Sequence, residues 1–267
     1  MIESQPRKTR LIALCGKGGT GKTAISAMIT RVLIDEAESG TLLLIDADPA
    51  MGLPHALGTT VKRTMGQVRE EIIKTARGSD AQRMAWLSDR IDYMVFEALI
   101  ETDKFALLAM GRTESLGCFC PVNDLLRDAI EVLSQNFATV IIDGEAGLEQ
   151  INRQVIQRLD TLIIVSDATS RGIHTASQIK KMVQNDKVIE CGDVGLVFNR
   201  VQQNASLLTK AAKDMDLRVL GYIPQDEEVA RFDLIGKTLL ELPPDSSALT
   251  AVRTMVDEYV MPRNRYH

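Results

Sequence analysis

The sequence predicts an α/β fold with a doubly wound, mostly parallel sheet and helices on both of its faces. Short runs that are apolar at every position alternate with longer amphipathic segments, as expected of strands that helices cover on each side. Several of these runs end in turns rich in Asp and Gly, where ligands bind in open α/β sheets. No Pro-, Gly- or Ser-rich linker divides the chain, so residues 1–267 are expected to form a single domain.

The elements follow in order along this pattern. The expected strands are residues 11–15, 41–45, 105–110, 138–142, 161–165, 194–198 and 217–223. The expected helices are residues 22–37, 64–90 with a break at 78–80, 122–135, 173–183 and 246–259. Residues 91–97 alternate in part between apolar and polar positions, which is a strand-like pattern. Pro121 fits near the start of a helix, where its missing N–H costs nothing.

Composition limits the classes of partner. The chain is 45% hydrophobic and 25% charged, with a formal net charge of −5 and a pI near 5.4. This acidic balance disfavours nucleic acid and anionic lipid as partners. Residues 1–8 lack the apolar region expected of a secretory signal, and no run approaches the roughly 18 apolar residues of a membrane span. We therefore expect a cytoplasmic protein without membrane or nucleic-acid partners, whose cysteines bind metal, act in catalysis or lie buried instead of forming disulfides.

A glycine-rich loop follows the first apolar run. Residues 16–23 read Gly-Lys-Gly-Gly-Thr-Gly-Lys-Thr, which fits the phosphate-binding motif G-x-x-x-x-G-K-[ST]. Glycine lets consecutive backbone N–H groups turn toward phosphate oxygens, and the next helix adds its partial positive charge. We expect Lys22 to reach the β and γ phosphates of ATP and the Thr23 hydroxyl to ligate Mg²⁺. The predicted backbone cradle consists of Gly16, Gly18, Gly19, Thr20 and Gly21.

The lysines of this loop decide between two nucleotide sites. The same glycines satisfy G-x-G-x-x-G, the dinucleotide-binding motif, but that assignment leaves Lys17 and the Lys22-Thr23 pair without a role. A P-loop ATPase domain is therefore favoured. The run K-G-G-x-G-K-T resembles the deviant Walker A motif of the ParA/MinD group of dimeric ATPases. The resemblance implies that Lys17 crosses a dimer interface to the partner's nucleotide; the alternative is a solvated loop cation.

Acidic residues follow the second and fourth expected strands. Asp48 is expected to approach the γ-phosphate, because the ends of the first two strands should be neighbours, and to position the attacking water. Asp46 is expected to hold the Mg²⁺ shell or the loop, although Asp-Ala-Asp-Pro is also an ordinary turn sequence. Asp143 has the Walker B arrangement. Glu145 and Gly147 then belong to a predicted nucleotide-sensing switch over 144–150.

Two later strand ends are candidates for the nucleotide base. Asn199 and Arg200 follow the run 194–198, and the Pro224-Gln225-Asp226 turn follows the run 217–223. The Asn199 amide could hydrogen-bond to the edge of adenine. The turn that contains Pro224 and Asp226 could pack beside the base and form one side of its pocket. Because Asn and Asp are also common in turns, a purely structural role for these residues remains open.

The second informative stretch is Cys118-Phe119-Cys120. Two thiolates cannot complete a tetrahedral metal site, and no C-x-x-C or nearby histidine supplies the rest. Two identical pairs that meet on a two-fold axis would supply four thiolates, a set that suits Zn²⁺, Ni²⁺, Cu⁺ or an iron–sulfur cluster. Two buried cysteines, or one reactive thiol pair, are the alternatives.

Four stretches together resemble the CooC/AcsF-type maturation ATPases, a branch of the MinD-like group that helps to insert nickel into carbon monoxide dehydrogenase or acetyl-CoA synthase. They are 16–23, Asp46-Ala47-Asp48-Pro49, Met110-Gly111-Arg112 with Gly117-Cys118-Phe119-Cys120-Pro121-Val122-Asn123, and Asp143-Gly144-Glu145-Ala146-Gly147. The resemblance covers about residues 8–250. It implies an ATP- and Mg²⁺-dependent homodimer that binds Zn²⁺ or Ni²⁺ between its C-x-C pairs. Its implied roles are Lys17 across the interface, Lys22 and Thr23 on phosphate and Mg²⁺, Asp48 at the water, and Cys118 and Cys120 on the metal.

Two departures from that family leave the client enzyme open. Ala24, which we place in the nucleotide site, replaces the usual hydroxyl residue and loses an α-phosphate contact. The switch continues Leu-Glu-Gln, where nickel-inserting members more often have Ile-Glu-His, so a corrinoid or iron–sulfur client is an alternative to carbon monoxide dehydrogenase. Two other functions also compete. One is a MinD- or ParA-like positioning ATPase; the other is a reductase resembling the nitrogenase iron protein, although that class spaces its cysteines far apart.

Overall fold

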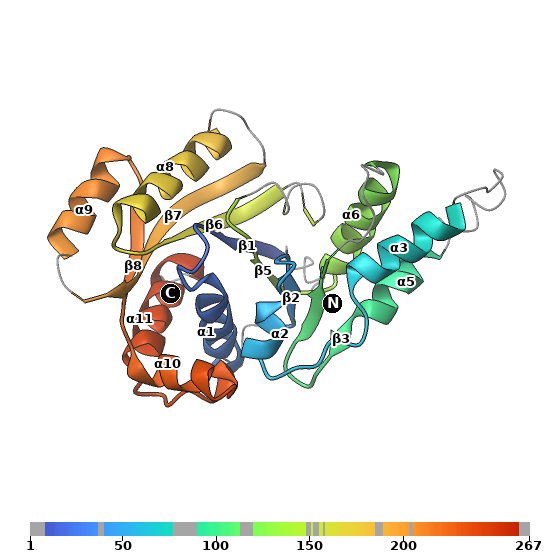
Figure 1. The fold of residues 1–267 in the computed structure, drawn as a ribbon, viewed down its shortest axis with the longest axis horizontal. Coiled ribbons are helices and arrows are strands. Elements are labelled where there is room, and N and C mark those ends of the chain that lie inside the picture. Colours follow the sequence, from blue (N-terminus) through green and yellow to red (C-terminus); the bar gives the residue numbers. More distant parts are fainter. Residues whose placement is uncertain are drawn as a thin grey trace, which may run out of the picture.

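Figure 1 shows the fold in a computed structural model, which describes residues 9–36, 40–76, 90–112, 120–147, 151, 155–156, 158–184, 189–202 and 205–261. These residues form an eight-stranded sheet in the order β3-β4-β2-β5-β1-β6-β7-β8. All neighbouring strands are parallel except β3 and β4. This confirms the predicted doubly wound sheet. The strands are β1 (Arg10–Cys15), β2 (Leu42–Asp46), β3 (Ile100–Glu101), β4 (Ala106–Ala109), β5 (Thr139–Asp143), β6 (Arg158–Ser166), β7 (Glu190–Val201) and β8 (Arg218–Pro224).

Helices cover both faces of the sheet (Figure 1). One face packs against α3 (Met65–Ala76), α5 (Ile91–Ala98), α6 (Cys120–Ser134), α8 (Ser170–Gln184) and α9 (Ala205–Asp214). The other packs against α1 (Lys22–Asp35), α2 (Gly52–Ala56), α10 (Glu227–Leu234), the 3₁₀ turn η1 (Leu239–Glu241), α11 (Ser247–Met255) and the π-helical turn η2 (Val256–Val260). A hydrophobic core lies on each face of the sheet. Alternate residues of β1 pack into one core or the other, because successive side chains of a strand point to opposite faces. Ala13 faces the first core and Ile12 the second.

The strand order corrects one expectation. The ends of β1 and β2 are not neighbours, because β5 lies between them and pairs with both. This insertion brings Asp143 of β5 beside β1 and also places it in register with Asp46 of β2. The acidic strand ends therefore meet at one edge of the sheet, although the neighbours differ from those expected.

The partial alternation over 91–97 does not form a strand. These residues belong to α5, where Ile91, Met94, Val95 and Ala98 are buried with helical spacing. Tyr93 and Phe96 lie on the exposed side of this helix. Their large apolar side chains on the solvent side obscure the alternation of apolar and polar faces that identifies a helix. The sequence reasoning also did not specify α2, β3, α9, α10 or η1.

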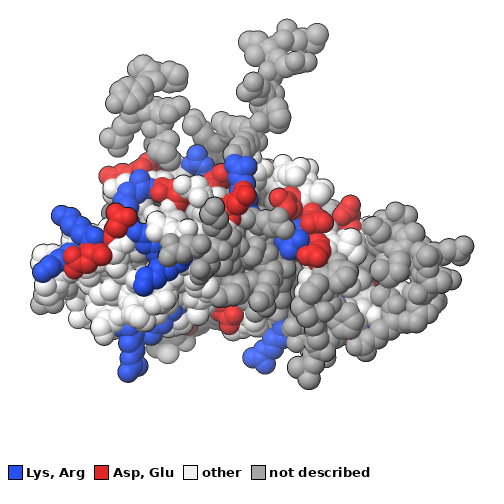
Figure 2. Space-filling model, turned by 90° about the horizontal axis from the view of Figure 1, so that it is seen from above, with Lys and Arg blue, Asp and Glu red and all other residues white. Residues whose placement is uncertain are grey.

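Surface charge is mixed on the face that Figure 2 presents. Acidic and basic side chains are interspersed there instead of forming one continuous area of a single sign.

No helix in the described part of the chain combines the length and the apolar character that crossing a bilayer requires.

Candidate nucleotide site

The glycine-rich loop connects the carboxyl end of β1 to the start of α1. Gly16 has φ 142°, and a Cβ there would stand 2.1 Å from the carbonyl oxygen of Val165 on β6. Gly21 has φ 89°, and its Cβ would stand 2.4 Å from Nδ2 of Asn199. Both positions therefore require glycine, because the conformation is left-handed and the space is filled. The loop is thus clamped between β1, β6 and β7.

Lys22 is only 7% exposed and folds back over this loop. Its Nζ donates to the carbonyl oxygen of Gly16 at 3.0 Å and to that of Lys17 at 3.4 Å. Thr20, 1% exposed, donates its hydroxyl to the same Lys17 carbonyl at 2.8 Å. A buried ammonium above a glycine-rich backbone at a helix N-terminus is a cradle for phosphate oxygens.

Asp143 lies directly below the start of α1 and is 1% exposed. Its Oδ2 accepts from the Thr23 hydroxyl at 2.7 Å and its Oδ1 from the Ser26 hydroxyl at 3.0 Å. Burial raises the pKa of Asp143 to about 6, against the lowering effect of the two hydroxyl donors and of the Lys22 charge. A hydroxyl and a carboxylate joined at hydrogen-bond distance beside a phosphate cradle fit the oxygen donors that Mg²⁺ prefers.

Asp46 organises the loop that follows β2. Its side chain is fully buried, and its two oxygens accept from the backbone N–H groups of Asp48 and Leu53, each at 3.0 Å. Burial and then the neighbouring charge of Asp143 raise the pKa of Asp46 to about 7. Asp46 was expected either to hold the Mg²⁺ shell or to hold the loop, and its two hydrogen bonds show that it holds the loop. Asp48 lies half-buried on the same loop, where its Oδ1 accepts from the N–H of Ala50 at 2.8 Å.

Asn199 and Arg200 lie next to the phosphate loop. Asn199 is 6% exposed, and its Nδ2 donates to the carbonyl oxygen of Thr20 at 2.8 Å. Arg200 adopts the left-handed conformation with φ 56°, and its Nη1 donates to the carbonyl oxygen of Gly19 at 3.3 Å. Both side chains therefore brace the loop from β7, a role that the sequence reasoning did not foresee. Their predicted contact with the base stays a prediction.

Asp226 is the N-cap of α10 and also holds the start of α11. Its Oδ1 accepts from the N–H of Glu228 at 2.9 Å. Its Oδ2 accepts from the hydroxyls of Ser246 and Ser247 and from the N–H of Ala248, at 2.7, 3.0 and 3.0 Å. Partial burial opposes the shift, but these donors, the Ala248 N–H first, lower the pKa of Asp226 to about 2. Pro224 ends β8 two residues earlier.

Lys17 lies at the rim of the loop with its side chain 35% exposed. Its Nζ stands 3.5 Å from Oδ2 of Asp167, which follows β6. Partial burial works against ionisation of Asp167, but a hydrogen bond from Thr169 and then the Lys17 charge lower its pKa below the usual range. The sequence reasoning missed Asp167, although a polar residue at the end of an apolar run is the same signal that identified Asp143.

The remaining predicted residues are described only in part. Ala24 lies in the first turn of α1, and Glu145 and Gly147 follow β5, while residues 148–150 of the predicted switch lie outside the described residues. Cys118 lies outside the described residues as well, and Cys120 begins α6. Three residues further on, Oδ1 of Asn123 accepts from Nε of the buried Arg69 at 2.7 Å.

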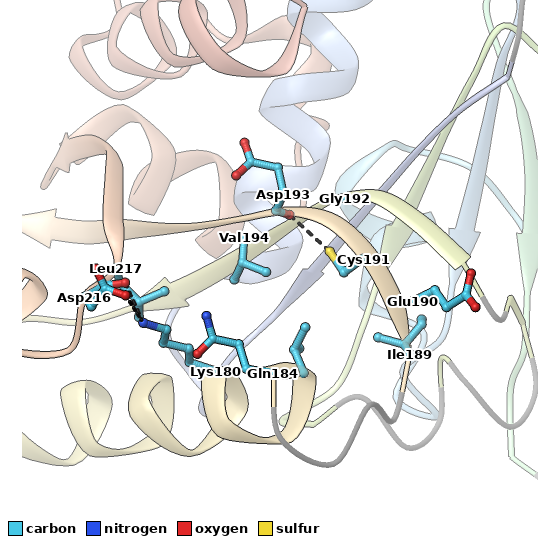
Figure 3. Close-up of a pocket in the computed structure, with 11 residues that line it drawn as sticks. Lys180, Gln184, Ile189, Glu190, Cys191, Gly192, Asp193, Val194, Asp216 and Leu217 are labelled. Carbon is cyan, nitrogen blue, oxygen red and sulfur yellow. Dashed lines mark hydrogen bonds and ion pairs between the residues drawn. The ribbon is translucent and has the colours of Figure 1, made fainter.

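A cavity of about 590 Å³ lies away from the phosphate loop, beside β7 (Figure 3). It opens beside the amino end of β7, at Cys191 and Asp193, and not at the carboxyl ends. Its lysine, Lys180, is bound by the carbonyl oxygens of Met215 and Asp216, at 2.7 and 2.5 Å, and by the Asp216 carboxylate at 3.0 Å. Burial raises the pKa of Cys191 to about 11, so its thiol stays protonated at neutral pH. The phosphate cradle therefore remains the candidate site.

Comparison with known proteins agrees with this geometry. Residues 11–239 match the CbiA family, described as the CobQ/CobB/MinD/ParA nucleotide binding domain. An uncharacterized ATP-binding protein of Methanocaldococcus jannaschii is 36% identical over 251 residues, which are 94% of this chain and 98% of that protein. The carbon monoxide dehydrogenase accessory protein CooC of Rhodospirillum rubrum is 30% identical over 255 residues, which are 87% of this chain and 90% of that protein.

Solved structures show the same fold. MinD of Pyrococcus horikoshii, in complex with Mg-ADP, superposes with a TM-score of 0.66 at 20% identity, covering 94% of this chain and 95% of that one. A ParA family ATPase of Chlorobium tepidum gives a TM-score of 0.68 at 18% identity, covering 92% and 96%. Binding of ATP or ADP with Mg²⁺ is typical of this family, and the cradle, its buried lysine and the Thr23–Asp143 pair are suited to it. The chain belongs to the CobQ/CobB/MinD/ParA family of nucleotide-binding proteins and is a P-loop ATPase.

Proposed function

We propose that the protein is an ATP-driven homodimeric maturation factor that binds a nickel or zinc ion between its two copies and assists a client metalloenzyme. The C-x-C pair carries the proposal: Cys120 begins α6, and Cys118 and Cys120 together supply half of a tetrahedral thiolate shell. A second copy related by a two-fold axis supplies the other half. Similarity to CooC supports carbon monoxide dehydrogenase as the client, with a corrinoid or iron–sulfur protein as the alternative.

The ATPase step in this proposal uses the residues of the cradle. Lys22 contacts the β and γ phosphates, and Thr23 with Asp143 holds Mg²⁺. Asp48 orients the water that attacks the γ-phosphorus atom, which releases ADP and phosphate. In this proposal the segment with Glu145 and Gly147 senses the γ-phosphate. Asn199, Arg200, Pro224 and Asp226, besides the structural contacts described above, are assigned to the surroundings of the base.

Lys17 gives the dimer its dependence on ATP. In the described chain it pairs with Asp167 of its own copy, with both side chains about one-third exposed. An exposed pair of this kind contributes only about 0.2–1 kcal/mol, so a phosphate from the partner's nucleotide can displace it. Closure through Lys17 then brings the two C-x-C pairs together, and hydrolysis separates them.

Metal analysis of the purified protein tests this function. The protein is loaded anaerobically with Ni²⁺ or Zn²⁺ in the presence of ADP or of a non-hydrolysable ATP analogue, and metal content is compared with the mass from light scattering. We expect one metal ion per two chains, and none for Cys118→Ser/Cys120→Ser. Stoichiometric metal in that double variant, or an affinity that ignores the nucleotide, would overturn the proposal. An absorption spectrum of the anaerobic protein would reveal an iron–sulfur cluster and indicate a reductase instead.

A positioning ATPase is the second candidate, and the shared fold with MinD and ParA structures favours it. Co-sedimentation with anionic liposomes or with plasmid DNA separates the two functions. ATP-dependent co-sedimentation without thiolate-bound metal would support the positioning ATPase. Metal binding without co-sedimentation would support the maturation factor.

A further inference from the structure

We propose that Ser26 is a positioning residue for the Mg²⁺ that accompanies the nucleotide, because its hydroxyl fixes the orientation of the Asp143 carboxylate. The inference rests on the role proposed for Thr23 and Asp143 at Mg²⁺, and it is independent of the metal proposed at the cysteines. Ser26 lies outside the glycine-rich motif of residues 16–23, so the motif alone does not identify it.

Ser26 and Thr23 hold the same carboxylate from one helix. They are three residues apart on α1, so their side chains lie on the same side of that helix. The Ser26 hydroxyl donates to Oδ1 of Asp143 at 3.0 Å, and the Thr23 hydroxyl donates to Oδ2 at 2.7 Å. Because Ser26 is fully buried and Asp143 is 1% exposed, bulk water does not replace the Ser26 donor. Each carboxylate oxygen therefore depends on its own hydroxyl.

The two hydroxyls have different tasks in this arrangement. A hydroxyl has one proton to donate and two lone pairs to offer. When the Thr23 proton is directed at Asp143, the direction of the carboxylate determines where the lone pairs of the Thr23 oxygen point. The terminal torsion of an aspartate is only loosely restrained by its own covalent structure. The hydrogen bond from Ser26 supplies the missing restraint, because it keeps Oδ2 turned toward Thr23.

The elements that carry these three side chains are themselves fixed. Asp143 ends β5, which pairs with both β1 and β2. Thr30, which is also fully buried, donates its hydroxyl to the carbonyl oxygen of Ser26 at 2.8 Å. Gly52 begins α2 beside Thr23, and a Cβ there would stand 3.4 Å from Cγ2 of that threonine. Rotation of the Asp143 carboxylate is therefore the freedom that the Ser26 hydrogen bond removes.

Removal of the Ser26 hydroxyl should act on the cation and not on the phosphates. Ser26→Ala leaves α1 helical, since alanine is the most favourable helix residue. It deprives Oδ1 of Asp143 of its donor, so the carboxylate can rotate and Thr23 no longer presents its oxygen in one direction. The phosphate cradle keeps its contacts, because Lys22 binds the carbonyl oxygens of Gly16 and Lys17.

The experiment measures the affinity for ADP by isothermal titration calorimetry, once with Mg²⁺ and once with EDTA. The ratio of the two affinities is the magnesium gain, which should be well above one for the wild-type chain. In Ser26→Ala the gain should fall by about tenfold, the lower end of the range for residues that orient metal ligands. The affinity in EDTA should equal that of the wild type, whereas general damage to the site would lower both affinities.

Two further variants separate positioning from the loss of a buried hydroxyl. Thr30→Val is the matched control, because Thr30 is equally buried on the same helix but donates to the backbone carbonyl of Ser26. Its magnesium gain should equal that of the wild type. Ser26→Cys keeps a side chain of similar size with a weaker donor. Its gain should therefore lie between those of the wild type and Ser26→Ala.

A wild-type magnesium gain in Ser26→Ala would overturn the inference, and so would an equal fall in Thr30→Val or a weaker affinity in EDTA. If Ser26→Ala does not fold, as judged by thermal melting, Ser26→Cys decides, and a wild-type gain there would contradict the role of Ser26. The underlying assignment fails differently. A wild-type gain in Asp143→Asn would show that Asp143 does not serve Mg²⁺ at all, whatever the result for Ser26.

Discussion

At the scale of single residues, Asp46 and Asp143 show how burial changes a carboxylate. They end neighbouring strands in register, and both side chains are almost completely excluded from water. Their pKa values, about 7 and about 6, therefore lie well above the ordinary value of 3.8. A divalent cation at this strand edge would offset the repulsion between the two carboxylates, which ties nucleotide binding to pH.

Asp46→Asn tests this with a pH-dependent stability. A carboxylate whose pKa is raised on folding stabilises the native state while protonated, and that contribution disappears as the pH rises through about 7. Relative to Asp46→Asn, the wild-type chain should lose about 2 kcal/mol of unfolding free energy between about pH 5.5 and about pH 8. Urea unfolding without Mg²⁺ or nucleotide measures it. The asparagine amide can accept only one of the two backbone hydrogen bonds, so Asp46→Asn also lowers the unfolding free energy by an amount that does not depend on pH. If the unfolding free energies of the two proteins changed in parallel with pH, the expectation would be contradicted.

Asn199→Leu tests the brace on the phosphate loop. Leucine cannot donate to the carbonyl oxygen of Thr20, so the loop loses a buried hydrogen bond worth about 1 kcal/mol or more. We expect Mg-ADP to bind about tenfold more weakly, by isothermal titration calorimetry. Arg200→Ala removes only the longer, exposed contact with Gly19 and should cost less than threefold, roughly the lower end for such bonds. Equal losses in the two variants would refute a specific role for Asn199.

At the scale of elements, Asp226 joins two helices that are separated by 12 residues, from Leu234 to Ser247. Its carboxylate accepts from the starts of both α10 and α11. A single carboxylate thus ties the start of α10 to the start of α11, the helix that packs against β8 and α1.

Asp226→Asn should lower the unfolding free energy by about 1–2 kcal/mol at neutral pH, because an amide nitrogen faces donors that need an acceptor. The pKa of Asp226 is lowered on folding, so the wild-type advantage is present above the ordinary value of 3.8 and disappears as the pH falls toward about 2. Chemical unfolding of both proteins from about pH 6 to about pH 3 checks this. A difference that stays constant over that range would contradict the capping role of the charge.

Gly66→Ala tests the approach of α3 to the end of β4. Alanine normally favours a helix over glycine by about 1 kcal/mol, but here its Cβ would meet the Arg112 carbonyl at 2.4 Å. We expect a net destabilisation of about 1–3 kcal/mol by overpacking, measured by thermal melting. Gly221→Ala is the control, since its Cβ would meet Met255 at an ordinary 3.5 Å. A stabilised Gly66→Ala protein would show that the contact is loose.

At the scale of the whole molecule, the sequence predicted what depends on local spacing. The phosphate loop and the parallel sheet follow from contiguous motifs and continuous apolar runs. The insertion of β5 between β1 and β2 could not be predicted this way, because strand order depends on how distant helices pack. The partners of Lys17 and Arg69 lie 150 and 54 residues away in sequence, so no local pattern connects them.

The base-side residues show the same limit. Asn and Asp at strand ends predict a polar site, but the spacing does not distinguish a ligand contact from a structural one. Asp226 accepts from four donors at 228 and 246–248, and Asn199 donates to the phosphate loop. The helix α5 was not predicted for a different reason. Tyr93 and Phe96 are exposed, so apolar residues occur on both sides of this helix and its periodicity is not visible in the sequence.

The edges of the sheet carry a consequence for assembly. β3 contributes only two residues, and the pairing of β7 with β8 contains shifts of register between Leu196 and Val197 and between Phe198 and Val201. Short or irregular edge strands are poor templates for another strand, so open-ended stacking of sheets into fibres is disfavoured. In the proposed homodimer, the two copies would therefore meet through loops and helices instead of through paired edge strands. Surfaces of that kind can close around a two-fold axis, so the proposed dimer would have a fixed size and could form and separate as nucleotide is bound and hydrolysed.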